Sequence, residues 1–507
     1  MEERLRSTTG GGPTAATVGR LLARVRLPGG YRGELLVLLL VAVAALAVVS
    51  PHTPQDVTRI SLTRALVEDG SLRIDPYAAQ AFDRADFGGH AYSDKAPGWS
   101  FAAAPWFALL HAAAAAPPAS AAAWNAEGDL RVWALRVLVS GLLFLVAVLL
   151  VGRVAQRVAP GTGAAVAVLF GLGTLAQPLA ASGFGHVAAG AAAFAGFALA
   201  WRATRGTGGA GLDGRAGTGP RADRGLLAAA GLCLGLGVLF EYQVALLAVL
   251  VALYTVRRGL RALGWLVAGA LPAAGALMAY DAVAFGSPFH LSYRYVANRY
   301  AEAQHGGLFG IGTPHLDTLW RVLAGDRGLV VVSPVLVAAA LGLVLLWRQG
   351  WRAEALLCGA ATLVFLLVNA GYFLPYGGNS PGPRFLAPAL PFLAIGLAPA
   401  LRRWPLPTLA LGLVSLVAET VVSLTWTGLP ESGYPGTVWG QLAHSLRALG
   451  GGFGDTLLVR VMSGSLWSRV TGDRVAAGGL GLAAGLLALA VAAALLRAAR
   501  QPAPGRV

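Results

Sequence analysis

The sequence predicts an all-α polytopic membrane protein of about twelve transmembrane helices, with interfacial helices in its first outer loop. Composition is the first observation, because 56% of the residues are hydrophobic and only 12% are charged, whereas soluble domains carry about 25% charged residues. The second is that apolar runs near the ~20 residues needed to cross a bilayer recur from Leu35 to Leu496. The third is that arginines stand in short clusters between these runs, as is typical of membrane topology.

The arginine clusters set the expected topology, because short loops rich in Lys and Arg stay on the cytoplasmic side. We assign both tails to that side, together with the loops around Arg153/Arg157, Arg202 to Arg224, Arg257/Arg258/Arg261, Arg348/Arg352 and Arg402/Arg403. The predicted spans are then residues 34–50, 131–151, 161–180, 186–201, 225–240, 243–256, 262–284, 328–347, 355–374, 385–401, 405–426 and 476–498. We expect the first span to be retained, since no small-residue cleavage site follows it.

One apolar segment, APGWSFAAAPWFALLHAAAA at residues 96–115, upsets this assignment if it is counted as a span. A thirteenth span here would place the arginine-rich loops that follow it outside. We favour a helix that lies at the outer interface without crossing, because the prolines, tryptophans and histidine of the segment suit an interfacial position.

The topology divides the chain into two tails and two transmembrane modules. These are a cytoplasmic tail 1–33, a module 34–284 with outer loop 51–130, a module 285–498 with outer loops 285–327 and 427–475, and a cytoplasmic tail 499–507. The first outer loop has at least two helical stretches of interface length, 56–69 and 97–115.

Several classes of function are excluded. The net charge of +15 lies in short clusters rather than along a groove, which argues against nucleic-acid binding. Cys233 and Cys358 both fall in apolar runs and are expected in the core. The sequence contains no HExxH, no Walker motif and no Cys/His cluster, so it requires neither a metal nor a cofactor.

The start of the first outer loop carries a candidate base. In SPHTPQDVTRISLTRALVEDG, Asp56 stands about one helical turn beyond the first span, and Arg59 follows three residues later on the same helical face. A carboxylate held at the lipid surface beside a cation can accept a proton from an attacking hydroxyl. Glu68, Asp69 and Asp83 are interpreted instead as acids of a solvated loop.

The stretch GGHAYSDKAPGWS, residues 88–100, holds Lys95, which is the only lysine among 39 basic residues. Lysine offers a compact charge with three donors, whereas arginine binds as a planar fork. A lysine at the start of an interfacial helix is placed to meet an anionic lipid headgroup, with phosphate as the natural candidate. The alternative is that one lysine survives by chance.

Two later stretches bring cations and aromatic groups to the outer face. Tyr293 and Arg294, in HLSYRYVANRY, suit an interfacial helix that touches headgroups or sugars, with simple anchoring as the alternative. Arg384 follows a Gly-Pro turn at the outer mouth of a span, where it could clamp a phosphate from the side opposite Lys95. The alternative is that Arg384 only marks the end of a span, although arginine is disfavoured outside.

Three further ionisable residues stand at or near membrane depth: His186, Glu241 and Glu419. Such residues are costly in lipid and are candidates for function. Glu241 is expected at an outer hairpin, where it could shape an acceptor pocket. Glu419 is expected either to act at the site or only to pair with a neighbouring helix.

These features together resemble a known family. An acid follows the first span, the first outer loop contains the element Tyr92-Ser93-Asp94-Lys95-Ala96-Pro97, and Asn125, Glu127, Arg131 and Arg136 lead into the second span. The arrangement resembles the GT-C membrane glycosyltransferases, in the branch of the protein O-mannosyltransferases and lipid A aminoarabinose transferases. That branch carries K-P-P-L where this chain has Lys95-Ala96-Pro97-Gly98, and many of its members have paired acids where this chain has the single Asp56.

The resemblance implies an inverting glycosyltransferase of the bacterial plasma membrane that works on the outer face. Its donor would be a polyprenyl-phosphate sugar, and its acceptor a hydroxyl of a glycan, lipid or protein. The resemblance carries Asp56 over as general base and Lys95 as the ligand of the donor phosphate. We add Arg59 and Arg384 as phosphate ligands, and as pocket residues His186, Glu241, Tyr293, Arg294 and Tyr92.

Two other classes of protein compete with this interpretation. A transporter or lipid flippase for envelope precursors would line a path at mid-membrane with ionisable residues, whereas here they gather near one face. A non-catalytic partner in envelope assembly would transfer no sugar when purified.

Overall fold

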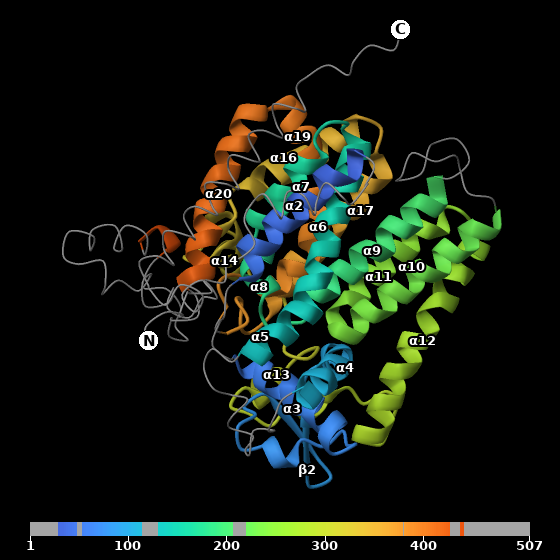
Figure 1. The fold of residues 1–507 in the computed structure, drawn as a ribbon, viewed down its shortest axis with the longest axis vertical. Coiled ribbons are helices and arrows are strands. Elements are labelled where there is room, and N and C mark those ends of the chain that lie inside the picture. Colours follow the sequence, from blue (N-terminus) through green and yellow to red (C-terminus); the bar gives the residue numbers. More distant parts are fainter. Residues whose placement is uncertain are drawn as a thin grey trace, which may run out of the picture.

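The computed structural model describes residues 29–47, 53–113, 130–205, 220–378, 380–425 and 437–440, so the predicted span 476–498 and most of the predicted loop 427–475 lie outside the described residues. The described helices form a bundle that is capped at one end by a layer of short elements (Figure 1). We call this the outer layer. It consists of residues 53–113 and 286–315.

The elements follow one another in the order that the apolar runs predict. The first half contains α2 (Gly29–Leu46), α3 (Pro54–Glu68), η1 (Asp75–Tyr77), β1 (Arg84–Phe87), β2 (His90–Ser93), α4 (Gly98–Ala113), α5 (Leu130–Arg136), the π-helix η3 (Val137–Gly141), α6 (Leu142–Val158), α7 (Gly163–Leu172), α8 (Ala176–Ala180), α9 (His186–Arg205), α10 (Pro220–Phe240) and η4 (Tyr242–Val244). The second half contains α11 (Ala245–Val256), α12 (Leu260–Phe285), η5 (Ser292–Tyr295), α13 (Ala301–His305), α14 (Leu316–Ala324), α15 (Leu329–Val332), α16 (Val335–Arg348), α17 (Arg352–Gly371), η6 (Arg384–Ala389), α18 (Leu390–Ala394), α19 (Leu397–Arg403) and α20 (Pro405–Thr425).

The protein is a multi-pass membrane protein. Within the described residues, 6 helices are long and apolar enough to cross a membrane, and two bent helix pairs raise the number to as many as 8. Three shorter apolar helices, Gly33–Leu46, Gly163–Leu172 and Tyr242–Val256, coincide with other predicted spans. The all-α polytopic fold class is therefore confirmed.

Three of the predicted spans are broken or bent rather than single straight helices. The span predicted at 161–180 breaks between α7 and α8, and the one at 385–401 bends by 53° between α18 and α19. The span predicted at 328–347 breaks at Ser333–Pro334, where the two arms meet at 95°. Proline lacks the amide that would continue the helix, and the amide of Val335 instead donates to Ser415 Oγ at 2.8 Å.

Small residues bring α9, α10 and α12 close together. A Cβ added to Gly231 would collide with the carbonyl of Leu266 on α12, and one added to Gly237 would lie 3.1 Å from the carbonyl of Ala189 on α9. The three helices run side by side along one flank of the bundle (Figure 1).

The outer layer joins the first two outer loops. Strands β1 and β2 pair antiparallel in a hairpin, and its turn residues Gly88 and Gly89 have φ of 59° and 80°, which is the conformation that favours glycine in two-residue turns. The second loop pairs with the same hairpin, since the amide of Ala297 donates to the carbonyl of Arg84 at 3.0 Å. The two loops therefore fold as one layer.

Helix α4 lies beside α3 in the outer layer (Figure 1). Among the described helices, α4 is not one of those with the length and composition of a span, which agrees with the predicted non-crossing helix. Its start packs tightly on the bundle, because a Cβ added to Gly98 would stand 2.5 Å from the carbonyl oxygen of Leu239. A side chain at position 98 would therefore collide with the backbone of α10.

Candidate functional site

The N-terminus of α3 fixes Asp56. Thr53 is the N-cap residue, and the amide and hydroxyl of Thr53 donate to Asp56 Oδ2 at 2.8 and 2.7 Å. This capping box satisfies amides that the first helical turn leaves without intrahelical partners. Asp56 is fully buried, and its carboxylate faces the bundle rather than the solvent.

Arg136, at the end of α5, is the cation beside Asp56. Its Nε donates to Asp56 Oδ1 at 2.8 Å, and the two side chains are 1% and 0% exposed. Arg59, three residues further along α3, pairs with Glu241 instead. Sequence spacing of three residues put both on one face of α3, but the bundle supplies a cation from another helix.

The segment Ser182-Gly183-Phe184-Gly185-His186, between α8 and α9, forms the centre of the site. We call it the 182–186 loop. A Cβ on Gly183 would collide with the Asp56 carboxylate, and one on Gly185 would stand 2.5 Å from Glu241 Oε1. Neither glycine can therefore be replaced without moving the loop or a carboxylate.

Arg59 and Glu241 form the second buried ion pair. Arg59 Nη2 lies 2.6 Å from Glu241 Oε1, and Arg59 Nη1 donates to the carbonyl of Ala96 at 3.4 Å. His186 Nδ1 lies 3.5 Å from the same Glu241 oxygen, which is within ion-pair distance but long for a hydrogen bond. Arg59 thus connects α3, the turn after Lys95 and the hairpin before η4.

Lys95 lies between two carboxylates. Its Nζ is 2.8 Å from Asp94 Oδ2 and 3.2 Å from Asp83 Oδ2, and its side chain is 12% exposed. Burial alone would lower the pKa of Lys95, but the two carboxylates raise it above the ordinary lysine value. The interpretation of Asp83 as a solvated acid was wrong, because the fold of the outer layer brings it to Lys95.

Arg384 is a buried cation without a carboxylate partner among the described residues. Its guanidinium carbon stands 4.3 Å from the ring centre of Phe184 and 5.2 Å from that of Phe385. Its Nε makes no hydrogen bond within the described part of the chain. Lys95 and Asp83 both lie within electrostatic range of this guanidinium, so Arg384 and Lys95 lie near one another.

The remaining predicted pocket residues divide into two groups. Tyr293 lies near the site, with its ring edge-on to Tyr242 at 5.2 Å and within electrostatic range of Glu241. Tyr92 is buried in the outer-layer core instead, with its ring 5.3 Å from that of Phe285. Arg294 is exposed. The structure therefore brings Tyr293 to the site but neither Tyr92 nor Arg294.

Glu419 lies away from the site and pairs with a neighbouring element, as one of its two predicted roles required. Its Oε1 accepts a hydrogen bond from Ser333 Oγ at 2.5 Å, at the break between α15 and α16. Ser333 Oγ in turn accepts from the amide of Leu175 at 3.0 Å. This buried network ties α20 to the broken helix and to the segment that leads to α8.

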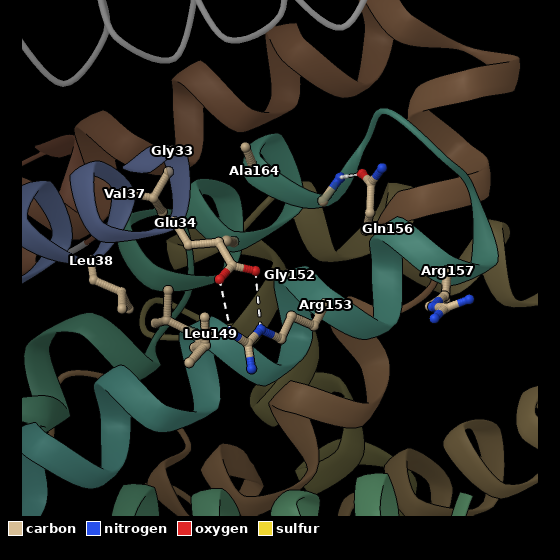
Figure 2. Close-up of a pocket in the computed structure, with 13 residues that line it drawn as sticks. Gly33, Glu34, Val37, Leu38, Leu149, Gly152, Arg153, Gln156, Arg157 and Ala164 are labelled. Atoms are coloured by element: carbon tan, nitrogen blue, oxygen red, sulfur yellow. Dashed lines mark hydrogen bonds and ion pairs between the residues drawn. The ribbon is translucent and has the colours of Figure 1, made fainter. Parts of the chain in front are cut away.

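A cavity of about 470 Å³ lies at the opposite end of the bundle, between α2, α6 and α7. Figure 2 shows Glu34 reaching Arg153 through two hydrogen bonds, at 3.0 and 2.8 Å. None of the predicted site residues lines this cavity, and Asp56, Lys95 and Arg384 all belong to the other end.

The fold and the site together define a polytopic membrane protein with a charged cluster between the helix bundle and its outer layer. No protein-family model matches the chain, and no curated protein matches it in sequence. Among solved structures, it is similar to ArnT from Cupriavidus metallidurans in the apo state, with a TM-score of 0.51 and 14% identity over 96% of this chain and 74% of that chain.

Two further structures give lower scores. ArnT from the same organism bound to undecaprenyl phosphate has a TM-score of 0.49 and 15% identity, over 96% of this chain and 78% of that chain. The oligosaccharyltransferase of Archaeoglobus fulgidus in the apo form has a TM-score of 0.47 and 12% identity, over 86% of this chain and 60% of that chain. The likeness to apo ArnT shows that this chain shares the fold of that protein.

Proposed function

We propose that the protein is a membrane glycosyltransferase that transfers a sugar from a polyprenyl-phosphate donor to an acceptor hydroxyl. The site would face the outer side of the plasma membrane, with both termini in the cytoplasm. The observation that carries the proposal is Arg384, a buried cation with no carboxylate partner among the described residues, beside Lys95 and close to the buried carboxylates of the site. A buried charge without a partner is costly, so an anionic group of the substrate is the natural occupant.

The position of this anion site supports a lipid donor. Lys95 lies in the outer layer between β2 and α4, and Arg384 begins η6, after the loop that follows the membrane helix α17. A phosphate carried on a polyprenyl chain can reach that level while its chain stays in the bilayer. A soluble nucleotide sugar would need an extended pocket for its nucleoside, and the described part of the chain contains no domain built for one.

The reaction would proceed by a single displacement. The acceptor oxygen attacks the anomeric carbon, the bond from that carbon to the phosphate oxygen breaks, and its electron pair leaves with the polyprenyl phosphate. Asp56 accepts the hydroxyl proton as the new bond forms. One displacement inverts the anomeric configuration.

Cationic side chains would stabilise the leaving group. Lys95 and Arg384 face the phosphate, where negative charge increases as the bond breaks. Arg59 is already engaged with Glu241 and with the carbonyl of Ala96, so we assign it the task of positioning the turn that carries Lys95. Glu241, His186 and Tyr293 would border the pocket for the sugar or the acceptor.

Glu419 argues against a transport path at mid-membrane. The Glu419 carboxyl is fully buried and accepts a hydrogen bond from Ser333 at the break between α15 and α16, so it is engaged in the packing of the bundle. The buried ion pairs of Asp56 with Arg136 and of Arg59 with Glu241 lie instead beside the outer layer.

The test is a transfer assay with the purified full-length protein in lipid nanodiscs. A panel of polyprenyl-phosphate sugars, labelled in the sugar, is supplied with membrane glycan, lipid and protein acceptors. We expect transfer from one donor, with polyprenyl phosphate released in equal amount. Asp86→Asn is the control, because Asp86 pairs only with Arg84 on the exposed hairpin. Absence of transfer and of polyprenyl-phosphate binding would contradict the proposal.

A further inference from the structure

Asp83 has an unusual position for a carboxylate at a phosphate site. It lies in the turn between η1 and β1, and its Oδ2 stands 3.2 Å from Lys95 Nζ. Among the nearby negative charges, Asp83 has the largest electrostatic effect on Arg384. One carboxylate is therefore paired with Lys95 and lies within electrostatic range of Arg384, the two cations to which the proposed function assigns the donor phosphate.

The site has no surplus of positive charge. Its basic side chains are Arg59, Lys95, Arg136 and Arg384, and its acidic side chains are Asp56, Asp83, Asp94 and Glu241. Four cations thus face four carboxylates within the described residues. An incoming phosphate makes the buried cluster net negative unless one carboxylate turns away or is neutralised.

Asp83 is the carboxylate that can leave at least cost. The side chains of Asp56 and Glu241 are 0% and 5% exposed and are held by Arg136 and Arg59. Asp94 is 3% exposed and adjoins Lys95 in the chain, whereas Asp83 is 14% exposed. Because Asp83 belongs to neither a helix nor a strand, its side chain can rotate toward water without breaking a ladder of backbone hydrogen bonds.

We propose that Asp83 is a displaceable carboxylate that holds Lys95 in the donor-free protein and yields Lys95 to the lipid phosphate when donor binds. The inference rests on the proposed function and adds a residue to it. Asp83 keeps Lys95 charged and in place between turnovers. It also competes with polyprenyl phosphate for Lys95, which weakens the binding of the leaving product and favours its release.

Binding of sugar-free polyprenyl phosphate to the purified full-length protein in nanodiscs tests this inference. Asp83→Asn removes the competing charge while it keeps the shape of the side chain. We expect its affinity to rise about tenfold, which corresponds to about 1.4 kcal/mol. Asp83→Glu keeps the charge and is expected to bind within about twofold of wild type, as is the Asp86→Asn control on the neighbouring strand.

The outcomes separate this inference from the proposed function. If wild type binds polyprenyl phosphate and Asp83→Asn binds it equally or more weakly, the displacement idea is overturned while the proposed function stands. If neither protein binds it, both fall. If Asp83→Asn binds polyprenyl phosphate more tightly than wild type, while Asp83→Asn/Lys95→Met binds it no more tightly than Lys95→Met, the competition acts through Lys95 as proposed.

A second measurement uses the chain's single lysine. Lys95 is the only lysine. Acylation by a small amine-reactive reagent, located by mass spectrometry, therefore reports on this side chain separately from the N-terminal amine. We expect faster acylation of Lys95 in Asp83→Asn than in wild type, and protection by polyprenyl phosphate in both. An unchanged acylation rate in a folded Asp83→Asn protein would overturn the inference independently of the binding result.

Discussion

Arg136→Met is expected to destabilise the protein strongly, because it leaves the Asp56 carboxylate buried beside an uncharged side chain. The pair joins two atoms 2.8 Å apart in side chains that are 1% and 0% exposed. Removing one partner of such a pair typically costs about 3–5 kcal/mol, since the other charge is then buried without compensation. Removing both is much less costly, so the variant Asp56→Asn/Arg136→Met is expected to be more stable than the sum of the single losses by about 1–3 kcal/mol.

Equilibrium unfolding of the purified protein in mixed micelles, followed by tryptophan fluorescence, measures these free energies. Arg153→Met is the matched control, because Arg153 and Glu34 are also 2.8 Å apart but their side chains are 32% and 34% exposed. An exposed pair contributes only about 0–1 kcal/mol. If Arg136→Met lost no more stability than Arg153→Met, or if the losses at Arg136 and Asp56 simply added, the buried pair would not be the support that we describe.

Three further substitutions test separate parts of the account. Gly183→Ala is expected to lose transfer and about 1–3 kcal/mol of stability in an unfolding experiment, because the added methyl collides with the Asp56 carboxylate. Glu419→Leu is expected to cost about 1–3 kcal/mol by the same measurement, since it leaves the Ser333 hydroxyl without its acceptor, whereas Glu419→Gln keeps an acceptor oxygen and is expected to cost less. Asp94→Asn is expected to remove a pH dependence of stability between about pH 4 and 6, because burial raises the pKa of Asp94 to about 6 despite Lys95.

The sign of the Asp94 effect follows from proton linkage. The folded-state pKa lies above the ordinary value, so the folded protein holds this proton more tightly than the unfolded chain. The corresponding stability is present below about pH 4 and is lost as the pH rises through 6. Wild type should therefore lose stability relative to Asp94→Asn over this window and show a constant difference above it; a difference that stays flat from pH 4 to 7 would contradict the assignment.

The two other substitutions also have matched controls. Gly359→Ala places a methyl where nothing lies within 4 Å, so it should leave both stability and transfer nearly unchanged. If Gly183→Ala behaved in the same way, the close approach of the 182–186 loop to Asp56 would not matter for function. If Glu419→Gln were as unstable as Glu419→Leu, the hydrogen bond to Ser333 would not explain the role of Glu419.

The sequence predicted the features that local pattern and charge distribution determine. Apolar runs separated by arginines are sufficient to predict a polytopic all-α fold, and the parity of the arginine loops predicts that α4 does not cross the membrane. The lone lysine and the acid after the first span were also identified, because each departs from the composition around it. The structure then brings Asp56 and Arg384 to the 182–186 loop, with Lys95 within electrostatic range of Arg384.

The pairing of charges could not be predicted, because it depends on contacts between residues far apart in the chain. Asp56 pairs with Arg136 and Arg59 with Glu241, over separations of 80 and 182 residues. Asp83 looked like an ordinary loop acid until the outer layer folded it onto Lys95. A signal was present for the 182–186 loop, since two glycines flank Phe184 directly before a histidine at the start of a span.

The breaks in three predicted spans have a similar explanation. Hydropathy measures how apolar a segment is, and a bent pair of helices is as apolar as a straight one. The prolines did mark the break at Pro334, but a proline alone kinks some helices and ends others. At the 95° bend, the hydroxyl of Ser415 on α20 accepts a hydrogen bond from the amide of Val335. This contact with a distant helix cannot be read from the local sequence.

The most direct test of the central claim is sugar transfer by Asp56→Asn, measured on protein that is shown to be folded and to bind the polyprenyl-phosphate donor. The amide keeps the size of the side chain but is a far weaker proton acceptor than the carboxylate. The account predicts that donor binding stays within a few-fold of wild type while transfer falls by a factor of about 10²–10⁴, the usual contribution of a general base. Full transfer activity in a folded, donor-binding Asp56→Asn protein would contradict the assignment of the base.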